Sequence, residues 1–166
     1  MYEKSIELLN KAVADELAAV HQYMYFHFHL DDQGYDLLAS LFKQTAIEEM
    51  GHVELLAERI LFLKGDVVME VAGEIQSEQD VSKMLEIARH MEEESAHEYN
   101  LWANECAQNA DAVSKKIFED LVADEERHYD QYDVELDKLQ KYGDRYLALQ
   151  SIERSKSLVS GGAGAV

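Results

Sequence analysis

Two copies of the motif Glu-x-x-His, each inside an amphipathic helical run, constrain this chain of 166 residues more than any other feature. Glu49 and His52 form the first copy, within AIEEMGHVELLAERILFLKG, and Glu125 and His128 form the second, within LVADEERHYDQYDVELDKL. Residues three apart lie on the same face of a helix, so each motif presents one carboxylate and one imidazole together. Two such faces, opposed across a helical bundle, predict a dinuclear metal site.

The two motifs belong to an internal repeat. Four residue pairs share an offset of 76 positions (125 minus 49): Glu16 and Glu92, Tyr23 and Tyr99, Glu49 and Glu125, and His52 and His128. Each half of the chain therefore resembles a helical hairpin of the form E-x6-Y followed by E-x-x-H. The repeat selects Glu92 from a run of three glutamates and Glu125 rather than Glu126. It leaves out Glu48, which lies one helical step of about 100° from the core face.

A bundle core cannot hold four carboxylates and two imidazoles without compensation, because each unpaired buried charge costs several kcal/mol. Two divalent cations would neutralise the carboxylates, and oxygen ligands with one imidazole per ion favour iron or manganese over zinc or copper. We expect two terminal ligands, two bridging ligands and one histidine per ion: Glu16 and Glu92, Glu49 and Glu125, and His52 and His128, respectively. Tyr23 and Tyr99 either hydrogen-bond across this site or pack in the core with their hydroxyls satisfied elsewhere.

The sequence predicts an all-α fold, a four-helix bundle with a long crossover between helices two and three and a short C-terminal fifth helix. There is no proline to break long helices, and strand signals are weak. The expected helices are residues 5–30, 35–64, 80–109 and 111–141, followed by a short segment over 144–155. The long connection 66–80 lets helices two and three lie parallel. We expect Gly65 and Gly143 to end the second and fourth helices.

The apolar face of the first helix and the extent of the domain follow from the same periodicity. At helical spacing the first helix carries Ile6, Leu9, Val13, Leu17, Val20, Met24 and Phe28. The domain is expected to cover residues 1–156, and the small residues of 157–166 are expected to be disordered.

Composition excludes several classes of function. The formal charge of −19 would repel the phosphate backbone of nucleic acid. No apolar run approaches the ~20 residues that span a bilayer, and the charged N-terminal sequence lacks a signal-peptide apolar region, so we expect a cytoplasmic protein without a membrane partner. The single Cys106 excludes an internal disulfide and a cysteine-based metal site, and we expect it to be a small buried residue.

Over about residues 2–156, the chain resembles the ferritin superfamily, and bacterioferritins most closely. The stretches that carry the resemblance are ADELAAVHQY, AIEEMGHVELLAERILFLKG and ADEERHYDQYDVELDKLQKYG. Bacterioferritins are similar in having two symmetric half-sites, whereas ordinary ferritins are less symmetric and mini-ferritins place the iron site between subunits. The resemblance implies an iron-storage ferroxidase that binds two iron ions per chain and oxidises Fe(II) with O2 or H2O2. Ferric mineral would be stored in a hollow cage of 24 chains built from two-fold dimers.

The resemblance also implies haem b, one per dimer, held by Met50 of each chain. Met50 directly follows Glu49 and stands about 100° from the core face, so it is expected to point out of the bundle. The alternative is a methionine that packs in an apolar dimer contact. Gln33 and Gly51 depart from the residues that some relatives carry near the haem edge.

Other functions stay open at this stage. One is a haem-free ferritin or a cage that detoxifies peroxide. Another is an oxidase or peroxidase of the rubrerythrin type, which the lone cysteine disfavours because no rubredoxin-type donor can be present; a purely structural bundle is disfavoured by its buried charge. His21, His27 and His29 would suit a secondary iron or zinc site, although surface or interface histidines are favoured. An electron-donor protein that reduces stored iron is also left open.

Overall fold

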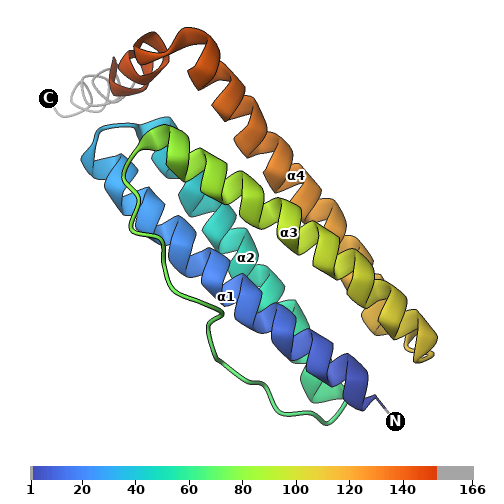
Figure 1. The fold of residues 1–166 in the computed structure, drawn as a ribbon. Coiled ribbons are helices and arrows are strands. Elements are labelled where there is room, and N and C mark those ends of the chain that lie inside the picture. Colours follow the sequence, from blue (N-terminus) through green and yellow to red (C-terminus); the bar gives the residue numbers. More distant parts are fainter. Residues whose placement is uncertain (1, 153–166) are drawn as a thin grey trace, which may run out of the picture.

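Four long helices account for most of the chain, as the absence of proline predicts. The computed structural model describes residues 2–152, and the helices are α1 (Glu3–Asp32), α2 (Asp36–Phe62), α3 (Val81–Gln108) and α4 (Ala112–Tyr142). α1 packs against α2 and α3 against α4, and the crossover runs back along the bundle, so that α2 and α3 point the same way (Figure 1). The predicted fold is confirmed, with every expected end of these helices within two residues of its observed position.

The helix starts differ in how their first backbone N–H groups are satisfied. The Asp80 carboxylate accepts a hydrogen bond from the Lys83 amide (3.0 Å) at the start of α3. Asp111 does the same for Ser114 (3.1 Å) at the start of α4. Both are N-caps of the favoured residue type, and such caps contribute about 1 kcal/mol each. α1 and α2 begin without a side-chain cap hydrogen bond.

The end of α2 differs from the prediction that Gly65 caps it. The residue with left-handed backbone geometry is Lys64, with φ of 65°. Gly65 donates its backbone N–H to the carbonyl of Ile60 (3.0 Å) in the turn that follows. A Cβ at Gly65 would lie 2.7 Å from Cγ2 of Ile6 on α1. Glycine is therefore required here by the close approach of the chain to α1, whereas Gly143 ends α4 with φ of 53° as predicted.

The apolar face of α1 also departs from the prediction in its second half. Phe28 is 61% exposed, although its spacing placed it on the core face. The residues that enter the core in this half of α1 are Ala19, Tyr23, Phe26 and Leu30. The predicted positions repeat every eleven residues (6, 17 and 28), whereas the buried positions 9, 16, 23 and 30 repeat every seven, and these two spacings diverge along a helix. The predicted face has therefore rotated out of the core by the end of α1.

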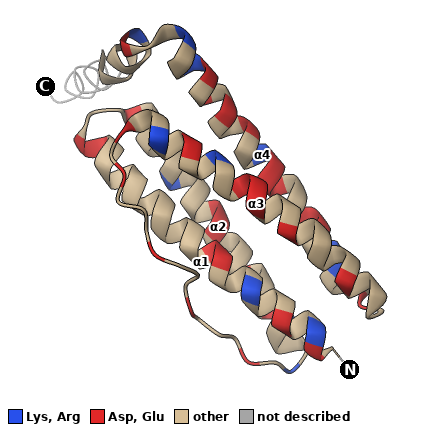
Figure 2. Ribbon diagram, viewed as in Figure 1, with Lys and Arg blue, Asp and Glu red and all other residues tan. Residues whose placement is uncertain are grey.

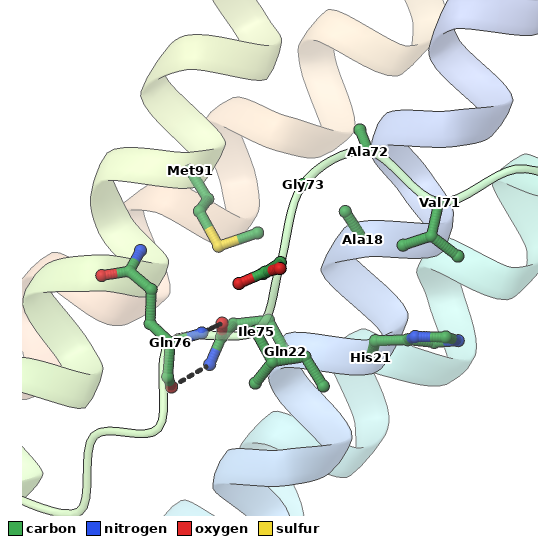
Figure 3. Close-up of a pocket in the computed structure, with 10 residues that line it drawn as sticks. Ala18, His21, Gln22, Val71, Ala72, Gly73, Ile75, Gln76 and Met91 are labelled. Atoms are coloured by element: carbon green, nitrogen blue, oxygen red, sulfur yellow. Dashed lines mark hydrogen bonds between the residues drawn. The ribbon is translucent and has the colours of Figure 1, made fainter.

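Side-chain amides of α1 hold the crossover in place. Asn10 donates to the carbonyl of Asp66 (3.0 Å) and accepts from the amide of Val68 (2.8 Å). Gln22 forms the same two-bond arrangement with the backbone of Gln76, at 3.1 and 2.8 Å, beside a cavity of about 350 Å³ (Figure 3). These bonds satisfy backbone groups of a segment that has no helix or strand partner of its own.

The buried apolar residues form two clusters, one on each side of a central polar belt. The first cluster includes Phe42 of α2, Leu85 of α3 and Tyr132 of α4. The second includes Leu56 of α2 and Phe118 of α4 on the other side. On α2, α3 and α4, the predicted ligands lie between the stretches that the two clusters use. Each cluster thus packs against one side of the site and fixes the helices that carry it.

A further helical stretch over residues 144–152 follows Gly143, as predicted. Gln150 accepts a hydrogen bond from the amide of Leu38 (3.1 Å) and so satisfies a backbone donor in the first turn of α2. Tyr146 is buried in the first cluster and donates a hydrogen bond to Glu135. The remainder of the predicted fifth helix and the predicted disordered tail over 157–166 lie outside the described residues.

Acidic residues occur along the length of the bundle and outnumber basic ones, as the formal charge of −19 requires (Figure 2). Cys106 is buried in the second cluster, as predicted. Within residues 2–152, no helix is long and apolar enough to span a membrane.

The turn after α2 can be tested by two substitutions with opposite expected effects. We expect Gly65→Ala to lower the free energy of unfolding by about 1–3 kcal/mol, because its Cβ would overlap Ile6. We expect Lys64→Gly to raise it by up to about 1 kcal/mol, because glycine adopts positive φ without steric cost. Urea unfolding of the purified variants measures both. If Lys64→Gly destabilised the chain as much as Gly65→Ala, this assignment of the two positions would be wrong.

Candidate metal centre

The six predicted ligands meet in the middle of the bundle, and all are buried. Each helix contributes to the set: Glu16 from α1, Glu49 and His52 from α2, Glu92 from α3, and Glu125 and His128 from α4. One group of possible metal ligands consists of Glu16, Glu49, His52 and Glu125. Each offers one nitrogen or oxygen atom, and these four atoms lie within 4.8 Å of one another. A second group of this kind pairs Glu49 and Glu125 with the other two residues. Two metal-sized groups therefore share two carboxylates.

The shared carboxylates divide their oxygens between the two halves. Oε2 of Glu49 lies 2.8 Å from Nδ1 of His52, and Oε1 lies 3.1 Å from Nδ1 of His128. Glu125 is arranged in the opposite order, with Oε1 3.3 Å from the His52 nitrogen and Oε2 3.2 Å from the His128 nitrogen. Each carboxylate can thus give one oxygen to each of two ions, which is the geometry that a bridging ligand needs. Both imidazoles present Nδ1 to the interior.

The two terminal glutamates are each held by a tyrosine from another helix. The hydroxyl of Tyr23 donates to Oε1 of Glu92 (2.6 Å), and that of Tyr99 donates to Oε1 of Glu16 (2.7 Å). Burial, together with neighbouring carboxylates, raises the pKa of both tyrosines well above its usual value, so both remain protonated donors. The second oxygen of each glutamate faces the histidine of its own half-site, at 3.5 Å for Glu16 and 3.8 Å for Glu92.

Several atoms at the centre have no hydrogen bond of good geometry. Among the described residues, the buried side-chain atoms without a hydrogen-bond partner include both oxygens of Glu49, Oε1 of Glu125 and Nδ1 of His52. Buried polar groups in this condition cost about 1–3 kcal/mol each, and more when charged. Cations between the carboxylates would use these same atoms as ligands. The donor set, hard oxygens with one imidazole per ion, fits iron.

Protons balance the charge of the centre when no metal is bound. Burial and a neighbouring carboxylate raise the pKa of Glu16 and of Glu92 well above the usual range. Burial alone would lower the pKa of His52 and His128, but close polar contacts with the surrounding carboxylates outweigh it and raise both pKa values. Burial would raise the pKa of Glu125, but its close contacts with the two histidines lower it to about 2. The two imidazolium groups thus offset part of the carboxylate charge that cations would otherwise neutralise.

Two acidic residues at the outer side of the histidines were missed by the sequence analysis. Nε2 of His128 lies 2.9 Å from Oε2 of Glu48, and Nε2 of His52 lies 3.4 Å from Oδ2 of Asp124. Each acid therefore contacts the histidine of the other helix, and outer partners of this kind fix the ring orientation of histidine ligands. The repeat could have identified them, because Glu48 and Asp124 are also 76 positions apart. Helical phase alone does not indicate Glu48, because it places this residue off the core face.

Met50 lies outside this centre, on the outer face of α2. Its side chain is 41% exposed and lines a groove of about 400 Å³ with apolar residues of α1 and α2, among them Val20, Met24 and Ile47. The predicted direction of Met50, out of the bundle, agrees with this position.

The three histidines near the end of α1 have separate surroundings. Nδ1 of His27 lies 2.8 Å from the carbonyl of Ala39, and the ring of His29 contacts that of Tyr25 at 4.4 Å between centroids. His21 lines the cavity beside the crossover (Figure 3). Within the part of the chain that the structure describes, none of the three belongs to a group of potential metal ligands.

Comparisons with known proteins agree with this geometry. The ferritin-like domain family matches residues 6–142. The chain is similar to the bacterioferritin of Desulfovibrio desulfuricans, with 37% identity over 87% of this chain and 81% of the relative. It is also 37% identical to the bacterioferritin of Brucella melitensis, over 85% of this chain and 88% of the relative. A third relative, the bacterioferritin of Rhodobacter capsulatus, is 35% identical over 88% of this chain and 91% of its own length.

A solved structure with a similar fold is the bacterioferritin of D. desulfuricans, described with its diiron site in different catalytic states. The TM-score is 0.88 and the identity is 36%, over 89% of this chain and 86% of the solved chain.

The charge balance of the centre predicts that metal binding releases protons. In the metal-free protein both histidine pKa values are raised, so both rings carry protons near neutral pH that a metal ion must displace. We expect titration with Co(II), which is stable to air at such sites, to release about two or more protons per chain, and the affinity to fall as the pH falls. Measurement in weakly buffered solution with a pH indicator checks this. Tight binding without proton release would contradict the charge assignment.

Proposed function

Because this chain belongs to the bacterioferritin family, with its ferritin-like fold, we propose that the buried centre is a ferroxidase site that oxidises Fe(II) for storage. The observation that supports the proposal best is the division of the Glu49 and Glu125 oxygens between the two half-sites. Carboxylates arranged in this way hold two divalent ions side by side. A site for one ion would not need two shared ligands.

Fe(II) is the substrate of the proposed reaction. Two ferrous ions lose one electron each, and the two electrons reduce O2 to H2O2, or H2O2 to water, with uptake of two protons. Paired binding therefore matches the electron count of the oxidant. The chain contributes position and charge: Glu16, Glu49, Glu92 and Glu125 balance the ions, and His52 and His128 complete the two half-sites.

The surrounding residues keep this geometry. Tyr23 and Tyr99 occupy one oxygen of each terminal glutamate, which leaves the other oxygen for an ion. The two apolar clusters exclude bulk water on either side of the belt, and electrostatic interactions are stronger in such surroundings. The chain is an iron-storage protein, and its family implies assembly into an oligomeric cage. We propose a cage of 24 chains built from two-fold dimers, with ferric mineral inside.

We also propose that Met50 binds haem b at the two-fold axis of a dimer. The groove beside Met50 suits a largely apolar group, because Val20, Met24, Ala46 and Ile47 line it together with the carboxylate-bearing Glu54. The thioether sulfur of Met50 from each chain would hold the haem iron.

Removal of a shared carboxylate tests the ferroxidase function. We expect Glu49→Ala or Glu125→Ala to reduce the initial rate of Fe(II) oxidation by more than about 100-fold, because one ligand of each half-site is lost. The free energy of unfolding of the metal-free protein should be unchanged or higher, since a buried charge is removed. Oxidation is followed by the absorbance of ferric products, and stability by urea unfolding.

The matched control is Glu58→Ala, which removes an exposed glutamate of the same helix and should leave the oxidation rate unchanged. If Glu49→Ala oxidised Fe(II) at the rate of the unchanged chain, the centre would not be the ferroxidase site.

Native mass and haem content test the assembly and the role of Met50 together. We expect a particle of 24 chains with about one haem per two chains, and we expect Met50→Leu to keep the mass and lose the haem, because leucine fills similar space without a sulfur ligand. Native mass spectrometry and the haem absorption band measure the two quantities. A 24-chain particle without haem would limit Met50 to packing, whereas a dimer alone would exclude storage in a cage.

A further inference from the structure

The outer side of the two histidines is built from residues of both α2 and α4. Glu48 of α2 contacts Nε2 of His128 on α4, and Asp124 of α4 contacts Nε2 of His52 on α2. The two contacts thus cross between the helices in opposite directions. α2 and α4 are packed against each other much more sparsely than α1 against α2 or α3 against α4. These polar contacts therefore connect two helices that approach each other at few points.

Arg127 connects the two acids. Its Nη2 lies 2.7 Å from Oε2 of Glu48 and 3.1 Å from Oδ1 of Asp124. The same nitrogen lies 3.3 Å from Nε2 of His128. One guanidinium group therefore joins α2 to α4 and lies beside the outer nitrogen of His128.

This contact breaks the internal repeat. The acids repeat at the offset of 76 positions, but the counterpart of Arg127 is Gly51 (127 minus 76). Gly51 has open space around it and no side chain that could reach the acids. The single arginine thus serves both half-sites.

Stabilisation of the fold does not account for this arrangement. The side chains of Arg127, Glu48 and Asp124 are 45%, 41% and 45% exposed. Ion pairs with this exposure contribute little to stability, because water screens them. The position of Arg127 is more informative than the small stability contribution of its ion pairs. A metal ion that left the centre between α2 and α4 would have to pass the histidines and then Glu48, Asp124 and Arg127.

We propose that Arg127 is a positioning residue that closes the α2–α4 side of the metal centre and slows the exchange of metal ions with solvent. It acts through Glu48 and Asp124, which it holds against the outer nitrogens of the histidines. The proposal rests on the proposed function, since it assumes that the centre binds metal. It makes the centre retain its ions longer than the six ligands alone would.

Release of Co(II) to an excess of a strong chelator tests this inference without any oxidation chemistry. We expect Arg127→Ala to accelerate release by about tenfold, the lower end of the effect of removing a residue that supports metal ligands. Arg127→Lys keeps the charge but cannot reach both acids with a planar group. Its rate of Co(II) release should therefore lie between those of the unchanged chain and Arg127→Ala. The visible absorption of bound Co(II) gives the rate in each case.

The matched control is Arg89→Ala. Arg89 forms an ion pair of the same length, 2.7 Å, with Asp133, joins α3 to α4, and is 36% exposed. The Arg89→Ala variant should release Co(II) at the rate of the unchanged chain. Urea unfolding should give similar midpoints for both alanine variants, which separates an effect on exchange from an effect on the fold.

The outcomes are distinct for the two proposals. If the unchanged chain does not bind Co(II) at all, the proposed metal centre is wrong. If it binds Co(II) and Arg127→Ala releases it at the unchanged rate, Arg127 is only a surface ion pair and this inference is wrong. Equal acceleration by Arg89→Ala and Arg127→Ala would also overturn it, because a general loosening of the bundle would then explain the result.

Discussion

The burial of four carboxyl groups at the centre of the bundle is the constraint on which the rest of this structure depends. Glu49 and Glu125 lie between the two half-sites, and both oxygens of Glu49 and Oε1 of Glu125 have no hydrogen-bond partner. Each of the four helices must bring a ligand to this point, so the apolar residues are divided into two clusters on either side. The cost of the polar belt is tolerated because both clusters are well filled with large side chains.

The two halves of the chain share the ligands but differ at the surface. The groove beside Met50, on α1 and α2, is lined mainly by apolar residues. The counterpart of Met50 at the offset of 76 positions is Glu126, which lines a groove of about 390 Å³ on α3 and α4 together with Glu93 and Asp130. One hairpin therefore offers an apolar face suited to association, and the other presents acidic groups to solvent. Two ions with the same ligand set would require a symmetric interior, whereas no such requirement would act on the surface.

The polar residues around the centre form layers with different physical roles. Inner oxygens of the shared carboxylates face the inward nitrogens of His52 and His128, and protonated tyrosines hold the terminal glutamates. The outer nitrogens face half-exposed acids, which Arg127 joins. Charge compensation thus passes from buried groups, where each unpaired charge is costly, to exposed groups, where water screens it.

The sequence by itself determined the helices, their order and the six candidate ligands, because helical phase and the repeat are properties of spacing along the chain. It did not determine which residues approach one another across helices. Phe28 lies outside the core because the buried positions of α1 repeat every seven residues, whereas the predicted ones repeat every eleven. Gly65 is required because the chain passes close to α1. The contacts of Glu48 and Arg127 depend on the distance between α2 and α4. Only the tertiary structure sets that distance, since it results from the packing of both apolar clusters.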